Sequence, residues 1–345
     1  MDKQCASTTG CALLIRPTEL DIEITYFSPL PFNMKTLHVA VGVIKNTNGQ
    51  ILISLRKPSL HQGGLWEFPG GKLESGETAQ QALIRELNEE LAITVLASTP
   101  LMTLKHRYPE LTVQLHVFLV DQFSGLAKGN EGQAIKWVAA AKLTNYQFPA
   151  ANQAIIMAAQ LPCYYAILDD SDETQGLINL HNLLNRGIKL IQLRLKATPP
   201  EELSSFIKQA YPLCQKHGVR LLINSSVNNA RTYTLDGLHL TSRDLMSLSK
   251  RPPYLSSSAW LAASCHNLLE LQHAQQIGVD FVVLAPVLKT KSHPDTPPLG
   301  WEQFTHLVTQ INLPVYALGG LTQSNLIEAH KAGGQGIAAI RAFLE

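Results

Sequence analysis

The sequence has little charge, few cysteines and no long apolar run, and each shortage excludes a class of protein. Charged residues make up 16% of the 345 residues, and the net charge is only +1. A nearly neutral chain has no overall basic field to hold a polymeric nucleic acid by its phosphates, so we expect no such partner. No apolar run reaches the roughly 18 residues that cross a bilayer, so we expect no membrane partner either.

The cysteines are scattered, and no two of them form a CxxC pair. They are Cys5, Cys11, Cys163, Cys214 and Cys265. This pattern does not predict a disulfide framework or a zinc knuckle, and it favours a reducing, cytoplasmic location. The apolar stretch near the start, Cys11 to Ile15, is too short for a signal peptide, and acidic residues follow it.

Length and composition predict a globular chain of about two domains, because one domain takes roughly 150 residues. Residues 1–33 show no clean periodicity, and Met34 is an alternative start, so we treat 1–33 as an N-terminal extension of uncertain status. We expect a first domain over residues 34–160 and a second over residues 163–345. Leu161-Pro162 between them is the expected linker.

Two apolar runs open the first domain, and the Asn-Gly turn between them predicts a β-hairpin. Further along, apolar residues recur with the period of a helix. We expect strands at residues 37–44, 51–55, 111–120 and 134–137, and helices at residues 77–91 and 150–160.

The second domain alternates short apolar runs with helical stretches, which predicts a parallel (β/α)8 barrel in an α/β protein. The eight expected strands are residues 164–168, 190–195, 220–224, 237–240, 260–265, 281–287, 314–318 and 336–340. The sequence stops at Glu345, so we expect the barrel to lack its final helix. Another element must then shield that sector, and the first domain is one candidate.

Three glutamates lie on one face of the helix expected over residues 77–91. Glu86, Glu89 and Glu90 are spaced i, i+3 and i+4. Carboxylates this close raise one another's pKa, and a divalent cation such as magnesium removes the conflict. Arg85 is placed to orient a neighbouring carboxylate or a phosphate oxygen. The alternative interpretation is an acidic helix face that is simply solvated.

The glutamates complete a longer pattern: Gly71, five residues, Glu77, seven residues, then Arg-Glu-Leu-x-Glu-Glu. This pattern resembles the Nudix box, and residues 37–158, with LWEFPGGKLESGET and FPAAN, resemble the MutT type of Nudix hydrolase. The resemblance implies that this domain is an α/β/α sandwich with a mixed sheet. It also implies that the domain hydrolyses a nucleoside triphosphate to the monophosphate and pyrophosphate. One departure is Ala92, where the box normally has glycine.

The same resemblance implies roles for individual residues. The Gly71 carbonyl, Glu86, Glu89 and Glu90 would bind Mg2+, with Mn2+ as an alternative. Glu131, in GNEGQ, matches a further family glutamate that is a metal ligand or a base. The glutamates and Arg85 are the candidate catalytic residues, and which glutamate acts as the general base stays open.

Asn152, Arg56 and Phe68 are the candidate substrate-binding residues. An isolated Asn after a proline is also typical of a helix cap or a turn. In the MutT-type family the matching Asn reads the base, and Arg56 matches an arginine of the nucleotide site. Oxidation of guanine turns its N7 from an acceptor into a donor, and an amide then matches both O6 and N7. The resemblance therefore implies an oxidised purine substrate, 8-oxo-dGTP, removed from the nucleotide pool.

Polar residues of the second domain gather at the carboxyl ends of the expected strands, where barrel active sites assemble. The segments IQLRLK, INSS, DGLHL, AASCH, APVLKTKSHP and YALGG resemble the thiamine-phosphate synthase/TenI group of phosphate-binding barrels. The ligand site implied by this resemblance consists of Gln192, Arg194, Lys196, Asn224, His239, Asp244, Ser264, His266, Thr290, Gly319 and Gly320.

Two departures count against a full synthase. The synthase has an Asp where Ser225 stands, which leaves Asp244 as the obvious magnesium partner, and its lysine position reads His293. The barrel could be a synthase, or a TenI-like enzyme with His266 or His239 as general acid or base. It could also be non-catalytic, either a scaffold or a module that binds and senses a thiamine-related phosphate. For the Nudix half, the alternative substrate is a thiamine-pathway pyrophosphate.

Overall fold

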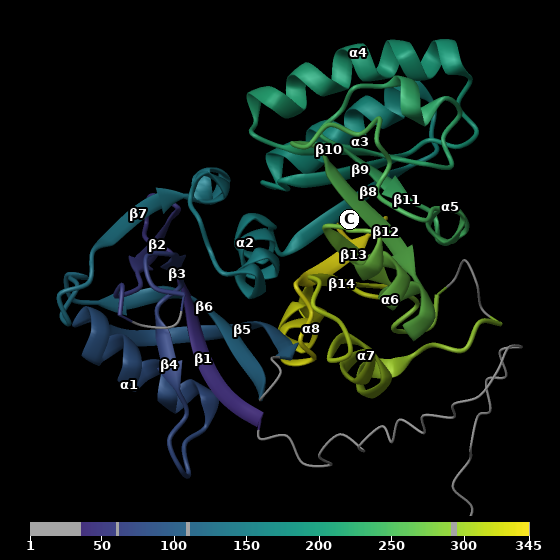
Figure 1. The fold of residues 1–345 in the computed structure, drawn as a ribbon. Coiled ribbons are helices and arrows are strands. Elements are labelled where there is room, and N and C mark those ends of the chain that lie inside the picture. Colours follow the sequence, from purple (N-terminus) through teal and green to yellow (C-terminus); the bar gives the residue numbers. More distant parts are fainter. Residues whose placement is uncertain (1–35, 60–61, 108–110, 291–294, 345) are drawn as a thin grey trace, which may run out of the picture. The chain divides into compact units, whose positions relative to one another are not determined.

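A computed structural model of the chain describes residues 36–59, 62–107, 111–290 and 295–344 (Figure 1). The expected N-terminal extension and His293 lie outside these ranges. No helix within the ranges is both long enough and apolar enough to cross a bilayer.

The described residues of the N-terminal part form two sheets and two α-helices. One sheet has the strand order β4-β1-β6-β5 and is mixed, because β1 runs parallel to β6 while the other pairs are antiparallel. The other sheet, β3-β2-β7, is antiparallel. The elements are β1 (Thr36–Ile44), β2 (Gln50–Leu55), β3 (Trp66–Glu67), β4 (Gly70–Lys72), α1 (Ala79–Leu91), β5 (Thr94–Arg107), β6 (Thr112–Ser124), β7 (Ile135–Ala139) and α2 (Gln153–Gln160).

Alternate residues of β1 face two separate cores, since successive side chains of a strand point to opposite faces. Ala40 and Ile44 pack with Leu83 and Leu87 of α1. Val41 and Val43 belong to the second core, which also contains residues of α2. The sheet is therefore covered by a helix on each face, which confirms the expected sandwich with a mixed sheet.

The predicted hairpin is wrong in its pairing. A turn does join β1 to β2, but the two strands lie in different sheets, and the pairing beside the turn is limited to an isolated bridge between Lys45 and Ile51. The reason is that β4 and β6 occupy both edges of β1, so β2 pairs elsewhere. Strand β5 was not predicted, and its register shifts, one of them beside Pro100, explain why its sequence lacks a clean alternation.

Both ends of α1 carry defined caps. Thr78 and Gln81 form a capping box at the start, and Ala92 ends the helix in the left-handed conformation, with φ 56°. A side chain at such a position costs roughly 1–2 kcal/mol, whereas glycine adopts it freely. Ala92 is therefore a locally strained replacement of the glycine that normally ends this pattern.

Replacing this alanine by glycine should stabilise the protein. We expect Ala92→Gly to raise the free energy of unfolding by about 1 kcal/mol, because the relief of strain exceeds the added flexibility of the unfolded chain. Thermal denaturation of the full chain measures the effect. The matched control, Ala82→Gly within α1, should lower stability. A lower melting temperature for Ala92→Gly would contradict the strain assignment.

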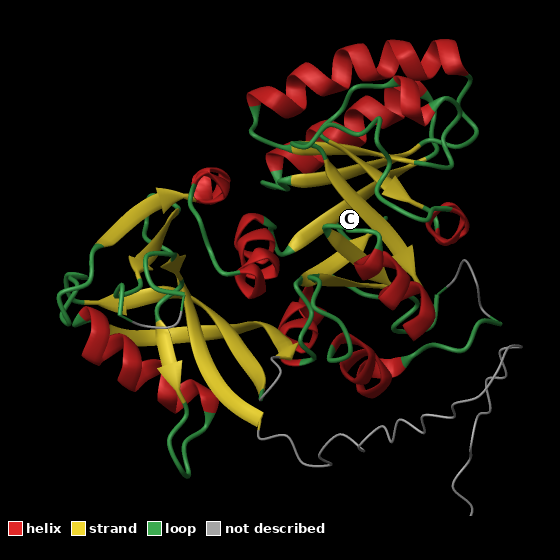
Figure 2. Cartoon of the chain, viewed as in Figure 1, coloured by secondary structure: helices red, strands yellow, loops and turns green. Residues whose placement is uncertain are grey.

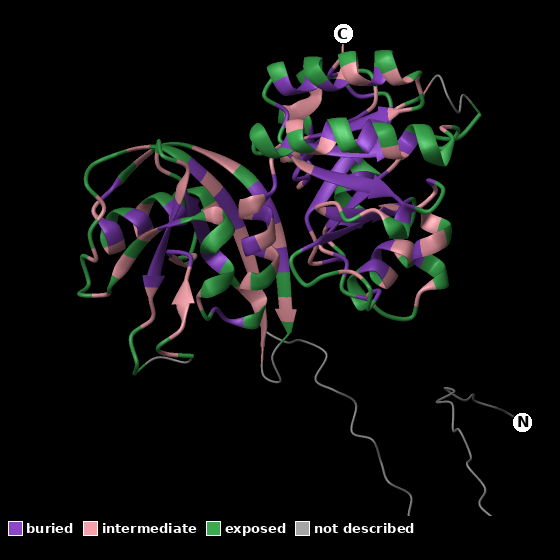
Figure 3. Cartoon of the chain, turned by 90° about the horizontal axis from the view of Figure 1, so that it is seen from above, coloured by how far each residue is buried: buried purple, intermediate pink, exposed green. Residues whose placement is uncertain are grey.

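The C-terminal part is a closed barrel of eight parallel strands with helices outside it (Figure 2), as predicted. The strands are buried, and the outer faces of the helices are exposed (Figure 3). The elements are β8 (Tyr164–Asp169), α3 (Glu173–Asn185), β9 (Leu190–Arg194), α4 (Pro200–Lys216), β10 (Arg220–Asn224), β11 (Gly237–Leu240), α5 (Ser242–Ser247), β12 (Trp260–Cys265), α6 (Leu268–Gln276), β13 (Phe281–Leu284), α7 (Gly300–Val308), β14 (Val315–Leu318), α8 (Leu326–Lys331) and β15 (Gly336–Ala339).

Two connections of the barrel depart from the regular alternation. Between β10 and β11 the chain forms one short 3-10 turn, Ala230–Thr232, in place of an α-helix. After β15 the described residues form turns, and Phe343 is fully buried against Tyr164 with ring centroids 5.1 Å apart. The tail itself therefore covers part of the sector that a final helix would shield.

Candidate functional site

The loop before α1 brings a glycine pair against the helix carboxylates. A methyl group on Gly71 would overlap the carboxylate of Glu86, and one on Gly70 would overlap the Ala40 carbonyl. Gly70 has φ 147° and donates its N–H to Glu90 Oε2 at 3.2 Å. Because neither Gly70 nor Gly71 carries a side chain, the backbone of β4 can lie against the carboxylates of Glu86 and Glu90.

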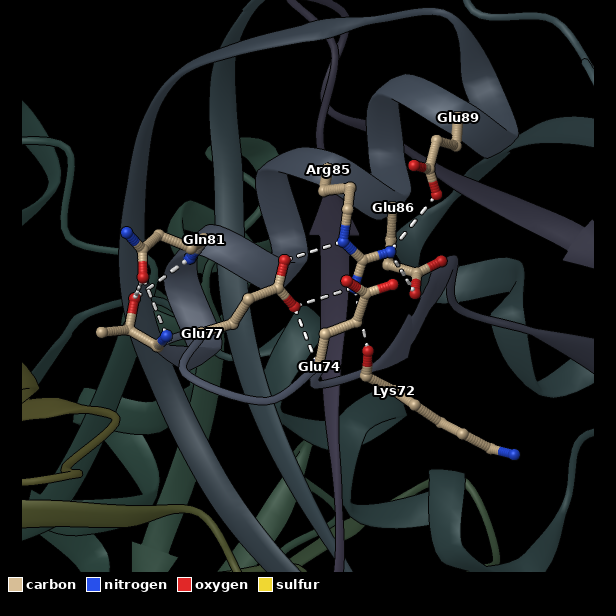
Figure 4. A network of polar contacts seen from close by, with 8 residues as sticks. Lys72, Glu74, Glu77, Gln81, Arg85, Glu86 and Glu89 are labelled. Atoms are coloured by element: carbon tan, nitrogen blue, oxygen red, sulfur yellow. Dashed lines mark hydrogen bonds and ion pairs between the residues drawn. The ribbon is translucent and has the colours of Figure 1, made fainter.

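Arg85 joins the helix carboxylates to the loop (Figure 4). Its guanidinium donates to Glu77 Oε1 at 2.8 Å, to Glu86 Oε1 at 2.9 Å and to the Lys72 carbonyl at 3.0 Å. It also reaches Glu89 Oε2 at 3.3 Å. The hydrogen bonds from Arg85 hold the pKa of Glu77 at about 2, so this pair stays ionised and fixes the loop on the helix.

Glu90 lies in the most crowded part of the site. Its pKa is raised to about 8, mainly by burial and also by the charges of Glu67, Glu86 and Glu131, against the opposing effect of the Gly70 N–H. Burial also raises the pKa of Glu67, although Arg56 opposes that shift. Excess negative charge at one place is the electrostatic condition that favours a bound cation.

Glu131 reaches this site because its loop is bonded to the end of α1. Asn130 donates its N–H to the Glu90 carbonyl and its side-chain amide to the Glu89 carbonyl, both at 2.9 Å. Gln133 donates to the same Glu90 carbonyl at 3.0 Å. These bonds use helix carbonyls that have no partner within the helix, and they fix Glu131 beside Glu89 and Glu90.

The residues present fit a divalent cation that binds oxygen. The donors are carboxylates and a backbone carbonyl, which are the ligands that Mg2+ and Mn2+ take, and Gly71 leaves room for close approach. In the described ranges no three potential ligands already converge on one point. Glu86 and Glu89 are turned toward Arg85, so binding a cation requires these side chains to rotate.

The three candidate substrate residues have different surroundings. Arg56 forms an ion pair with Glu67, and both are partly buried. Asn152 is the N-cap residue of α2 and ends the 3-10 turn Ala150–Asn152, but its side chain makes no capping hydrogen bond. Phe68 is buried and stacks on Phe148 with centroids 5.4 Å apart, which makes it part of the core under the site.

Four residues that contribute to the site did not emerge from the sequence. Glu67 pairs with Arg56, Lys57 pairs with Glu131, and Asn130 and Gln133 anchor the Glu131 loop. Glu67 carried a usable signal, because a charged residue between Trp66 and Phe68 is unusual in an apolar run. The other three depend on contacts between residues 41 to 74 positions apart, which no local pattern reveals.

Inside the barrel, several candidate residues form one buried chain of hydrogen bonds. Asn224 donates to Gln192 at 2.7 Å, Gln192 donates to the Tyr165 hydroxyl at 3.0 Å, and that hydroxyl meets His239 Nδ1 at 3.1 Å. His239 Nε2 lies 2.8 Å from Ser264 Oγ. Burial lowers the pKa of His239 to about 3, so the ring is neutral and enclosed. This environment argues against His239 as a general acid or base.

Asp244 is occupied by neighbouring hydroxyls. Its Oδ2 accepts from Ser225 Oγ and from Thr241 Oγ1, the latter at 2.8 Å, and Ser225 Oγ in turn accepts the Thr241 N–H. A magnesium–pyrophosphate site needs several free carboxylate oxygens. Asp244 alone, with one oxygen already bonded twice, does not fit such a group.

The remaining barrel candidates lie at or just beyond strand ends. His266 pairs with Glu270 at 3.0 Å and is half-exposed, so it is the accessible histidine of the two candidates. Arg194 binds Asp169 through two hydrogen bonds of 2.9 and 2.6 Å, and Lys196 lies in the bend after β9. Thr290 is the last residue described before residue 295.

Gly319 and Gly320 both have positive φ angles, 108° and 67°. Methyl groups there would approach Pro286 and overlap the Lys289 carbonyl. A backbone segment that only glycine fits can approach a ligand closely, which suits a phosphate.

Two protein families match two different parts of the chain. The NUDIX domain family matches residues 40–158, and the thiamine monophosphate synthase family matches residues 164–343. An 8-oxo-dGTP diphosphatase of Escherichia coli (strain K12) is 40% identical over 36% of this chain and 95% of its own length. A putative thiamine-phosphate synthase 2 of Aquifex aeolicus (strain VF5) is 34% identical over 54% of this chain and all of its own length.

A solved structure of MutT, from a study of the Aliivibrio salmonicida and Vibrio cholerae proteins, is 39% identical. It covers 36% of this chain and 97% of its own, with a TM-score of 0.33.

The raised pKa of Glu90 predicts a pH dependence of stability in chelator-containing buffer. Between the ordinary value of 4.5 and about 8, the folded chain holds a proton that the unfolded chain has released. The free energy of unfolding should therefore fall as pH rises through this window. In Glu90→Gln, the decrease in the free energy of unfolding over this window should be smaller by a few kcal/mol, since one pKa unit corresponds to roughly 1.4 kcal/mol. Parallel curves for the two proteins, measured by denaturant unfolding from pH 4.5 to 8.5, would show that Glu90 is not buried as described.

Proposed function

Because the chain belongs to the Nudix family through its N-terminal part and to the thiamine monophosphate synthase family through its barrel, we propose that the N-terminal site hydrolyses 8-oxo-dGTP to 8-oxo-dGMP and pyrophosphate. The crowding of Glu86 and Glu90 against Gly70 and Gly71 carries this proposal. The role would be to keep an oxidised nucleotide out of DNA synthesis, in the cytoplasm where the nucleotide pool lies.

Mg2+ or Mn2+ at this place would neutralise phosphate charge and lower the pKa of a bound water. Glu86, Glu89, Glu90, Glu131 and the Gly71 carbonyl are the groups that would hold the ion. Arg85 keeps the loop and the helix in register, so that the Gly71 carbonyl and the carboxylates face one site.

Asn152 supports the choice of base. Its amide is not used as a helix cap, and an amide presents one donor and one acceptor side by side. The oxidised base offers the complementary pair, O6 and N7–H, whereas guanine offers two acceptors. A mismatched buried polar group costs about 1–3 kcal/mol, which is the basis proposed for discrimination.

Truncating this amide tests the substrate assignment. We expect Asn152→Ala to lower kcat/KM for 8-oxo-dGTP by about 5- to 150-fold, as the loss of one or two buried hydrogen bonds implies. Gln153→Ala is the matched control, because Gln153 is the exposed next residue, and it should leave the rate unchanged. Equal rates for Asn152→Ala and the unaltered chain would contradict the proposed reading of the base.

A thiamine-pathway pyrophosphate is the second candidate substrate, and the barrel in the same chain favours it. Such a compound lacks the O6 and N7 edge of an oxidised purine. Its turnover should therefore be insensitive to Asn152→Ala, so the same variant distinguishes the two substrates.

For the barrel, the bonds that Ser225 and Thr241 make to Asp244 favour a phosphate ligand held without a catalytic metal. The backbone at Gly319 and Gly320 is the proposed phosphate cradle. This function differs from a magnesium-dependent synthase, because no step in it uses pyrophosphate as a leaving group.

Calorimetric titration of the full chain with a phosphorylated thiazole tests the barrel proposal. We expect the same Kd with and without Mg2+, and about tenfold weaker binding for Gly320→Ala, which would disturb a charge-assisted hydrogen bond. Asn152→Ala serves as the control that leaves this binding unchanged. Binding that requires Mg2+, or no binding at millimolar ligand, would contradict the proposal.

A further inference from the structure

Lys57 contacts the carboxylate cluster from outside the helix that carries it. It lies two residues beyond the end of β2, and its Nζ is 3.1 Å from Glu131 Oε2. The two side chains are 47% and 49% exposed, so water reaches both of them. Lys57 is therefore the immediate neighbour of a carboxylate assigned above as a cation ligand.

The backbone around Glu131 is rigidly placed, whereas its side chain is not. Asn130 and Gln133 bond the loop to the end of α1, and the Gln133 side chain also accepts the Glu131 N–H at 2.9 Å. The loop therefore holds Glu131 near Glu89 and Glu90 whichever way its carboxylate turns. An exposed ion pair is a weak interaction, so Lys57 can direct that carboxylate without locking it.

An ammonium group and a divalent cation compete at the same carboxylate. Both interact with its oxygens, and the two positive charges repel each other at short range. The competition can end when an anionic phosphate chain enters, since Lys57 Nζ then has a second partner. We propose that Lys57 is a positioning residue that holds Glu131 away from the metal site and so weakens cation binding until a phosphate substrate arrives.

This inference rests on the proposed function of the N-terminal site, and it makes a distinct claim about the nucleotide-free protein. Lys57→Gln should tighten binding of Mn2+, whereas Lys57→Arg, which keeps the charge and a donor, should leave it near that of the unaltered chain. Loss of any nearby positive charge could also tighten binding, so the effect must be shown to pass through Glu131.

The experiment is Mn2+ titration of the nucleotide-free full chain, followed by electron paramagnetic resonance of the free ion. Only the Mn2+ binding that is lost in the Glu86→Gln variant is counted as binding at this site. We expect Lys57→Gln to tighten it about three- to tenfold, the scale of an exposed ion pair plus one charge. In a Glu131→Gln background the same change should have at most a small effect.

Lys72→Gln is the control for simple loss of charge, because the Lys72 side chain points away from the carboxylates of the site (Figure 4). An equal effect of Lys57→Gln with and without Glu131, or no effect at all, would overturn the role of Lys57 while leaving the hydrolase intact. Absence of any Mn2+ binding that depends on Glu86 would overturn both this inference and the proposed metal site.

Discussion

The carboxylate of Glu86 lies where a side chain on Gly71 would have to be, and the amide of Gly70 is bonded to Glu90. This close approach of a strand to a helix depends on two successive glycines, and it gathers negative charge where burial makes that charge unfavourable. Arg85 compensates part of it by bonding two helix carboxylates and Glu77. Burial, together with the charges of Glu67, Glu86 and Glu131, raises the pKa of Glu90. The positions of Glu131, Lys57 and Glu67 matter because each changes the charge at this one place.

Much of this site could be predicted because its residues are close in sequence. Helical periodicity puts Glu86, Glu89 and Glu90 on one face, and the glycines precede them by a fixed spacing. The same reasoning could not find Asn130, Gln133 or Lys57, because their partners are distant in the chain. It also predicted a hairpin between β1 and β2, since the turn sequence says nothing about which strands occupy the edges of β1.

In the barrel, too, the sequence pattern predicted the strands but not the surroundings of individual side chains. Its eight strands could be predicted from alternating apolar and helical segments, and the structure closes them into one parallel barrel. The chemistry of individual residues could not. His239 was a reasonable candidate acid or base from sequence, yet it lies enclosed between Tyr165 and Ser264 with a depressed pKa. Asp244 was a candidate magnesium ligand, yet two hydroxyls already bond one of its oxygens.

The two parts of the chain, which belong to two families, carry candidate sites that differ in charge. The N-terminal site concentrates negative charge around Glu90, whereas the polar side chains of Asn224, Gln192, Tyr165, His239 and Ser264 inside the barrel bond one another. The most direct test is the kcat/KM of the full chain for 8-oxo-dGTP relative to dGTP in Mg2+, measured as pyrophosphate released. A preference of about tenfold or more for the oxidised nucleotide is the predicted result, since one mismatched buried hydrogen bond is worth that much. Equal values for the two nucleotides would contradict the proposed function.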